Sequence, residues 1–472
     1  MPTISWNLSV PLRETAMSHA PIASVLTLYL KFVPVTLHSK QRRRCCVFSL
    51  AVVIWLMIFQ RLQDKGTLAA AVQHVIRGMP PELNPRRGKR QRKHTVSSNT
   101  GGYNRARQML PLEVLRIVSD QIFEQLMAPE PGQRMFLLDG TTLTMPNTPS
   151  LLKAYPPSRN QRGESHWPIL RLLVAHDLES GIALRPEWGP AAGAETVSEQ
   201  QIAETLIPRL PVGAGIMGDQ NFGVFSIAWA AQQSGHPVLL RVTPARAKSA
   251  FGALFNSGTD ANVEWQPSRW ERESHPGLPR DASVKGRLII RKVYPSDGSA
   301  SIKLYLFTTL DTNAKKIVQI YAQRWNIETD LRNIKKTIHL ETLDCRTPEM
   351  IAKELIIAIT AYNMVRGVIN ESARRTGMDR RRYSFSRVLD LINSWLPHLA
   401  CISSEAERNA EYERLISYAG QCKLYKRKKS ASYPRAVWYR HRAFPPRKAE
   451  PRRYNSPGKE KSPSINANNL RH

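Results

Sequence analysis

Short apolar runs alternate with helical patterns across the middle of the chain. Four apolar runs between residues 135 and 245 are bounded by turn residues: MFLLD, PILRLLVAHD, GAGIMGD and PVLLRV. The segments ETVSEQQIAETLIPRL and SIAWAAQQSG lie among these runs and have helical spacing of their apolar residues. Because strands that alternate with helices build a sheet covered by helices, the pattern predicts an α/β fold.

The pattern changes on the C-terminal side of this region. Residues 246–312 lose the helical repeat, and GRLIIRKVY and IKLYLFTTL flank the turn-like SDGSAS, which predicts a hairpin in a β-rich insertion. Residues 313–332 and 348–370 again have the spacing of amphipathic helices. The second of these helices is expected to start with Thr347 as its N-cap and Pro348 at its first position.

The N-terminal quarter of the chain has helical patterns from residue 45 to about 128. The apolar run at 45–59 is shorter than the roughly 20 residues of a membrane span, so a buried core helix is the preferred interpretation over a membrane anchor. A second segment, 86–107, holds eight Lys and Arg residues and no acid. Such a segment fits a solvated loop or a contact with a DNA backbone.

Charge narrows the class of partner. The chain of 472 residues has 68 Lys and Arg against 38 Asp and Glu, which gives a net charge of +30. Nucleic acid is therefore the expected partner, because cations that neutralise phosphates release condensed counterions. The five cysteines show no paired spacing, so neither a disulfide framework nor a zinc site is expected. We therefore expect the protein to work in a reducing, intracellular compartment.

Three acids are candidates for catalysis in this basic chain. Asp139 and Asp219 each end an apolar run, which places both at the carboxyl ends of predicted strands, where sites in α/β sheets assemble. Glu328 lies on a predicted helix whose same face carries the DNA-contact candidates Tyr321, Arg324 and Lys335. Three carboxylates favour two Mg²⁺ or Mn²⁺ ions, which activate a hydroxyl for attack on a phosphodiester. A solvated helix with i,i+4 ion pairs is the competing interpretation of the helical face.

The spacing of these residues resembles a known family. Tyr321, Arg324, Glu328 and Lys335 match the Y-(2)-R-(3)-E-(6)-K motif of the type-4 insertion-sequence transposases, a bacterial DDE group. LLDGTTLTMPNTP, GDQNFGVFSIAWAA and CRTPEMIAKELIIAITAYNMVR are similar to the neighbouring blocks of that family, in the same order. The resemblance covers roughly residues 45–370.

The resemblance implies a fold and a chemistry. It implies a ribonuclease-H-like catalytic core with a β-rich insertion, preceded by an N-terminal all-α domain. Asp139, Asp219 and Glu328 are its implied metal ligands. The implied function is metal-dependent DNA cleavage and strand transfer at the terminal inverted repeats of its own insertion sequence, by a homodimer that moves the element by cut-and-paste transposition. In some relatives a tryptophan of the insertion stacks on a flipped base; Trp265 and Trp270 are the candidates, with strand packing the commoner role.

The resemblance and the composition together divide the chain. The predicted parts are a disordered leader at 1–40, a helical DNA-binding domain at 41–128, a catalytic domain at 129–375 with its insertion at about 246–312, a helical region at 376–422 and a basic, disordered tail at 423–472. The tail holds fifteen Lys and Arg against two Glu. A cytoplasmic, nucleoid-associated protein with no membrane contact is expected.

One departure from the family pattern leaves an alternative open. Relatives commonly have an arginine after the second aspartate, where this chain has Gln220, so a catalytically inactive, transposase-derived DNA-binding protein is the second interpretation. A third is an RNA- or ribosome-associated basic protein, which leaves the strand-end aspartates unexplained.

Overall fold

The computed structural model describes residues 47–64, 66–78, 96–127, 134–160, 163–252, 259–293, 301–402 and 404–424. All of them belong to one compact unit. The predicted leader, almost all of the basic tail and residues 86–95 of the basic segment lie outside the described residues. The predicted domain boundaries at 128 and 375 stay predictions.

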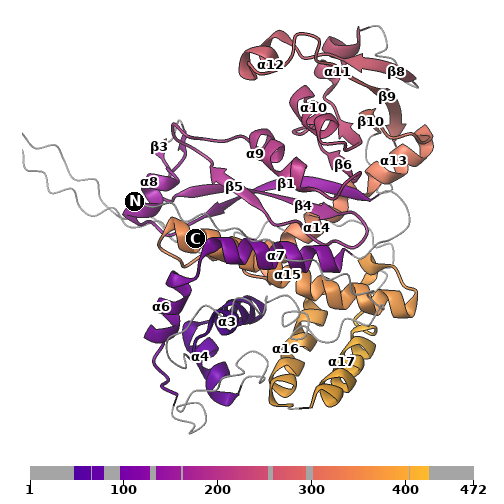
Figure 1. Cartoon of the computed structure of the whole chain (residues 1–472). Helices are drawn as coiled ribbons and strands as arrows, with labels where there is room; N and C mark the ends of the chain where they lie inside the picture. Colours follow the sequence, from indigo (N-terminus) through magenta and orange to yellow (C-terminus); the bar gives the residue numbers. More distant parts are fainter. Residues whose placement is uncertain are drawn as a thin grey trace, which may run out of the picture. The chain divides into compact units, whose positions relative to one another are not determined.

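A mixed sheet of eight strands lies at the centre of the protein (Figure 1). Its order is β5-β4-β1-β6-β7-β10-β9-β8. The pairs β1/β6 and β6/β7 are parallel, and the other neighbouring pairs are antiparallel. The strands are β1 (Met135–Thr144), β4 (Ile169–Asp177), β5 (Glu187–Pro190), β6 (Gly215–Gly218), β7 (Val238–Arg241), β8 (Asp260–Trp265), β9 (Val284–Val293) and β10 (Ile302–Thr308). A separate two-stranded ribbon joins β2 (Arg159–Asn160) to β3 (Gly163–Glu164). The α/β prediction is confirmed.

The sheet separates two hydrophobic cores, because side chains alternate across a strand. On β1, Leu137 and Leu143 face one core, and Phe136 and Leu138 face the other. The second core is covered by α9 (Glu199–Leu206), α10 (Phe225–Gln233) and α11 (Pro244–Phe251). The first is covered by α3 (Leu50–Leu62), α4 (Leu68–Arg77), α6 (Gly101–Met109), α7 (Leu112–Leu126), α13 (Ala314–Ala322), α14 (Asn326–Arg332), α15 (Pro348–Thr376), α16 (Phe385–Cys401) and α17 (Glu405–Ala419).

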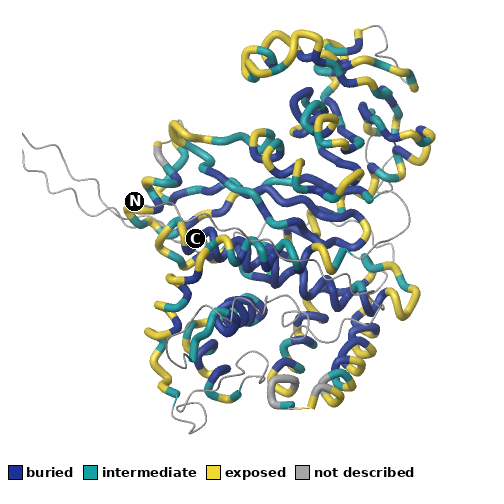
Figure 2. The backbone as a smooth tube through the Cα atoms, viewed as in Figure 1, coloured by how far each residue is buried: buried dark blue, intermediate teal, exposed yellow. Residues whose placement is uncertain are grey.

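Helix α15 organises the helical side of the molecule. It starts as predicted, with the Thr347 side chain accepting from the Met350 N–H and with Pro348 at its first position. It runs further than predicted and ends at Gly377, whose φ of 65° is left-handed. Figure 2 shows it buried along most of its length, because it packs against α3, α7, α16 and α17.

The apolar run at 45–59 contributes a core helix from Leu50 onward, as predicted, and residues 45 and 46 lie outside the described residues. Ser49 caps α3, and residues 51–59 are all buried against the first core. Within the described part of the chain, no helix has the length and apolar character needed to cross a membrane.

The predicted hairpin is confirmed in β9 and β10, which pair antiparallel, although most of its turn lies outside the described residues. The prediction that residues 246–312 contain no helices was wrong, because α11 extends into this region and α12 (Arg269–Ser274) lies within it. Each starts at a local capping signal: Thr243 with Pro244 for α11, and a Ser268/Glu271 capping box for α12. Strands β8 to β10 continue the main sheet through the β7/β10 pair.

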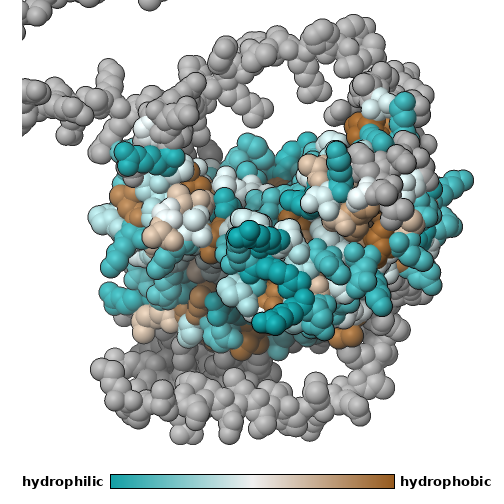
Figure 3. Space-filling model, turned by 90° about the horizontal axis from the view of Figure 1, so that it is seen from above, coloured by the Kyte–Doolittle hydropathy of each residue, from teal (hydrophilic) through white to brown (hydrophobic). Residues whose placement is uncertain are grey.

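Figure 3 shows a mostly hydrophilic face with small apolar patches.

Candidate active site

Two of the three candidate acids lie close to each other, Asp139 in β1 and Asp219 directly after the parallel strand β6. Leu137 of β1 is paired with Met217 of β6, and Asp139 and Asp219 each follow two residues later. Asp219 comes directly after β6, as predicted. Asp139 lies inside β1, not at its end as predicted, because β1 continues to pair with β4 as far as Thr144 after its pairing with β6 stops.

The electrostatics of Asp139 indicate a site that attracts cations. The pKa of Asp139 is raised to about 7, mainly by burial and also by the nearby charges of Asp219 and Glu199, against the lowering effects of the Gly140 N–H and Arg324. Carboxylates held this close oppose each other's ionisation. A divalent cation with a preference for oxygen ligands would relieve that repulsion, so the residues present fit such a group.

Glu199 is a component of the site that the sequence reasoning missed. It lies in the first turn of α9, and Asn221 Nδ2 donates a hydrogen bond to it. Its carboxylate covers Gly140: a Cβ on that glycine would lie 2.3 Å from Glu199 Oε1. Burial raises its pKa, while Arg171 and Asn221 lower it. The only sequence signal is the capping box that starts α9 at Ser198, and this signal says nothing about contact with β1.

The loop after Asp219 is held by its own backbone and by Arg246. The Asn221 N–H donates to Asp219 Oδ1 at 2.8 Å, and the Gly223 N–H donates to the Asp219 carbonyl at 3.0 Å. Arg246 Nη1 donates to the carbonyl oxygens of Gly223 at 2.7 Å and Gln220 at 3.3 Å. The loop that carries Gln220 is therefore fixed from the α11 side.

The segment that carries the third acid is not one continuous helix. Helix α13 ends at Ala322, a 3₁₀ turn covers Gln323–Trp325, and α14 is followed by a π-helical turn at Asn333–Thr337. The prediction of a regular helical face from Tyr321 to Lys335 was therefore wrong in its geometry. Single π-helical turns of this kind are frequent at functional sites.

The structure nevertheless brings several of these side chains to the two aspartates. Lys335 Nζ donates to Thr141 Oγ1 at 3.0 Å, and Thr141 lies two residues after Asp139 on β1. Tyr321 is 5% exposed, and its pKa is raised by burial and lowered by Arg324 and Arg241. The charge of Asp219 also acts on Tyr321, so the phenol lies near the site.

Glu328 does not form a metal-ligand group with Asp139 and Asp219 in this structure. Its half-exposed side chain pairs with Arg324, with 3.4 Å between Arg324 Nη2 and Glu328 Oε1. Within the described ranges, no group of three or more His, Cys, Asp or Glu side chains is arranged to hold a metal ion. Arg324 also lowers the pKa of Asp139, so the same guanidinium interacts with Glu328 and with one of the two aspartates.

The two tryptophans considered for base stacking differ in exposure. Trp265 is 1% exposed and packs edge-on against Phe251 and Phe307, so it is a core residue. Trp270 on α12 is 69% exposed.

The comparisons with known proteins decide the family. Residues 130–364 match the transposase DDE domain. The chain belongs to the DDE transposases. Over 367 residues it is 25% identical to the transposase InsG for insertion sequence element IS4 of Escherichia coli (strain K12), a match that covers 73% of this chain and 78% of that relative.

A solved transposase is also similar to this chain. It is the cryo-EM structure of the piggyBac transposase synaptic complex with hairpin DNA. The match covers 86% of this chain and 84% of that chain, at 11% sequence identity and a TM-score of 0.38. The family match includes Asp139, Asp219 and Glu328, and DNA transposition is the function that the family indicates.

Proposed function

We propose that this transposase cleaves DNA at the terminal inverted repeats of its own insertion sequence and joins the ends to target DNA by cut-and-paste transposition. Asp139, Asp219 and Glu328 are its proposed ligands for two Mg²⁺ or Mn²⁺ ions. The observation that carries this proposal is the placement of Asp139 in β1 near Asp219, which directly follows the parallel strand β6, with a pKa of about 7 for Asp139.

The strand pattern supports a ribonuclease-H-like core. Strands β1, β4 and β5 form an antiparallel half, and β6 and β7 continue the sheet parallel to β1 on its other side. We place the β-rich insertion after β7, where β8 to β10 lengthen the same sheet. The helices before β1 are the proposed N-terminal DNA-binding region.

The residues around the acids have distinct roles in this proposal. When bound, the cations supply the activation of the attacking hydroxyl and stabilise the leaving oxygen. Lys335, Arg324 and Tyr321 hold the phosphate backbone in register. Because Arg324 pairs with Glu328 in the free protein, a DNA phosphate that competes for the Arg324 guanidinium releases the Glu328 carboxylate toward Asp139 and Asp219.

The basic balance of the chain supports double-stranded DNA as the partner, both the repeats and the target. We further propose that a homodimer pairs the two ends of the element.

A cleavage assay tests the proposal. Purified protein is incubated with DNA that carries the repeats flanking its own gene, in magnesium, manganese or chelator, and the products are resolved on denaturing gels. Metal-dependent breaks at the repeat ends are expected, with loss in Asp139→Asn and Glu328→Gln. Glu341→Gln is the matched control, because Glu341 is an acid of the same region that pairs with Lys336 instead. Breaks that persist in Glu328→Gln contradict the proposal.

A catalytically inactive DNA-binding protein is the second candidate function. It is favoured by Gln220 and by the finding that, among the described residues, Glu328 does not form a metal-ligand group with the two aspartates. It predicts specific binding to the repeats with no breaks in either metal.

A further inference from the structure

Helix α14, which carries Glu328, has little to hold it in place by itself. It has seven residues, with a 3₁₀ turn before it and a π-helical turn after it. A helix this short is marginal without tertiary contacts. Its orientation must therefore come from contacts that the helix makes with its neighbours.

One of these contacts is made by the buried side chain of Asp330. Its side chain is fully buried and accepts hydrogen bonds from two arginines, Arg366 of α15 and Arg381 of the turn after α15. Arg381 Nη1 approaches both carboxylate oxygens, at 2.8 and 2.7 Å. Asp330 and Glu328 are two residues apart, about 200° around a helix, so one acid anchors the inner face while the other points outward.

Arg381 also bonds to the central sheet. Arg381 Nη2 donates to the carbonyl oxygens of Leu178 at 2.7 Å and Asp177 at 3.2 Å, at the end of β4. Asp330 is therefore linked through Arg381 to the strand that pairs with β1, which carries Asp139.

Among the described residues, the two arginines are the charged partners of Asp330. His176 lies 4.0 Å away, but burial lowers the pKa of His176 to about 4, so it is neutral near pH 7. Burial by itself would raise the pKa of Asp330, yet Arg366 and Arg381 lower it below its usual value. Bonds from charged donors are stronger and more directional than neutral ones, so the cluster fixes an orientation.

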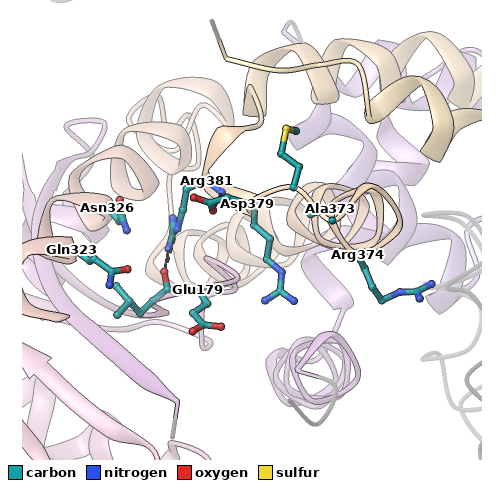
Figure 4. A pocket seen from close by; sticks show the side chains of 11 residues that line it. Glu179, Gln323, Asn326, Ala373, Arg374, Asp379 and Arg381 are labelled. Atoms are coloured by element: carbon teal, nitrogen blue, oxygen red, sulfur yellow. Dashed lines mark hydrogen bonds between the residues drawn. The ribbon is translucent and has the colours of Figure 1, made fainter. Parts of the chain in front are cut away.

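A cavity of about 700 Å³ lies next to this cluster. Figure 4 shows Arg381 beside Gln323 and Asn326, which flank Arg324 on the Glu328 segment, with Ala373 and Arg374 of α15 on the other side. The segment is therefore held on the helical side by its buried apolar residues Ile327, Leu331 and Ile334 and by the Asp330 cluster, which lies beside this cavity.

We propose that Asp330 is a positioning residue: through Arg366 and Arg381 it holds α14 so that Glu328 can join Asp139 and Asp219. The proposal rests on the proposed role of Glu328 as a cation ligand.

Glu354 provides a matched control. It is a buried carboxylate of α15 that is also held by two arginines, Arg61 and Arg107, but these belong to α3 and α6 and not to the Glu328 segment. Glu354→Gln and Asp330→Asn remove the same kind of charge from the same kind of cluster. A merely structural role of Asp330 predicts the same behaviour for both variants.

The test compares hydrogen exchange and metal requirement in the full-length protein. In Asp330→Asn, amides of residues 326–337 are expected to exchange about tenfold faster or more, and in Glu354→Gln they are expected to exchange as in the wild type. The Mn²⁺ concentration for half-maximal cleavage of repeat DNA is expected to rise about tenfold in Asp330→Asn only. Arg381→Lys, which keeps the Arg366 bond, is expected to give smaller changes in the same direction and serves if Asp330→Asn fails to fold.

Two results overturn the positioning role: unchanged exchange at 326–337 in Asp330→Asn, or a uniform increase across the protein in both variants. Absence of metal-dependent breaks in the wild type refutes the proposed function instead, and the exchange comparison still decides the role of Asp330.

Discussion

At the scale of single residues, the site contains a carboxylate whose ionisation destabilises the folded protein when no cation is bound. Burial opposes the ionisation of Asp139, and the charges of Asp219 and Glu199 add to that cost. Such an arrangement is expected where a cation completes the site, because perturbed carboxylates cluster at functional sites. The cost should be measurable in the metal-free protein.

Asp139→Asn is expected to stabilise the metal-free protein at pH 8. The folded protein keeps a proton on Asp139 up to a pH of about 7, whereas the unfolded chain releases it near 3.8. Stability is therefore lost as pH rises between these values, and the variant escapes that loss. The gain over wild type should grow from about pH 4 to about pH 7 and reach roughly 2–4 kcal/mol.

Thermal unfolding in chelator across this pH range measures the gain. Asp311→Asn, at an exposed acid, is the control and should show no growing gain. Added Mn²⁺ should raise the unfolding temperature of wild type more than that of Asp139→Asn. A gain that does not depend on pH would mean that Asp139 is not in conflict with its neighbours.

At the scale of elements, the site depends on how the loop after β6 meets the end of β7. Gly223 lies directly against the Arg241 backbone: a Cβ on it would be 2.0 Å from the Arg241 carbonyl oxygen. Both sides of this contact are backbone, so no side chain can move aside. The same glycine donates its N–H to the carbonyl of Asp219, so the contact also sets the position of that acid.

Gly223→Ala is expected to destabilise the protein by about 1–3 kcal/mol and to reduce cleavage, because the Asp219 loop must move away from β7. Urea unfolding measures the loss. Gly277→Ala is the matched control, since a Cβ there meets no atom within 4 Å, and it should change stability by less than about 0.5 kcal/mol. Equal unfolding midpoints for the two variants would show that the contact is not tight.

The elements also show which features the sequence could predict. Strands β1, β4, β6 and β7 were predictable because apolar runs bounded by turn residues carry that signal locally, as were the start of α15 and the β9/β10 pair. The position of Asp139 inside β1 was not, because strand length depends on pairing with β4. Glu199 was missed because its contact with Gly140 joins elements far apart in sequence.

The break at Gln323–Trp325 has no Gly or Pro to mark it. Tertiary bonds of Asp330 in α14 and of Lys335 in the π-helical turn hold the segment that follows the break, and contacts of this kind override helical propensity. The Tyr, Arg, Glu and Lys spacing therefore identified the family correctly, while its helical geometry did not hold.

At the scale of the whole molecule, charge is distributed unevenly along the chain. The last fifty residues carry fifteen Lys and Arg against two Glu, so they supply +13 of the net +30. Because each phosphate contact contributes to the salt dependence of DNA binding, this tail is expected to add affinity that does not depend on sequence.

Removal of residues 425–472 is expected to weaken binding to unrelated duplex DNA and to make its dependence on salt shallower, by roughly one unit of log–log slope for each phosphate that the tail neutralises. Fluorescence anisotropy over a salt series measures both quantities. A variant with a Gly/Ser tail of equal length controls for chain length. An unchanged slope would place the non-specific contacts elsewhere in the chain.

The central claim is that acids from β1, the loop after β6 and α14 share bound cations once DNA is present. Titration of Mn²⁺ into the protein bound to repeat DNA, with free Mn²⁺ followed by electron paramagnetic resonance, tests it most directly. The claim predicts tight Mn²⁺ binding in wild type and Glu341→Gln, and its loss in Asp139→Asn, Asp219→Asn and Glu328→Gln. Wild-type Mn²⁺ affinity in Glu328→Gln would contradict it.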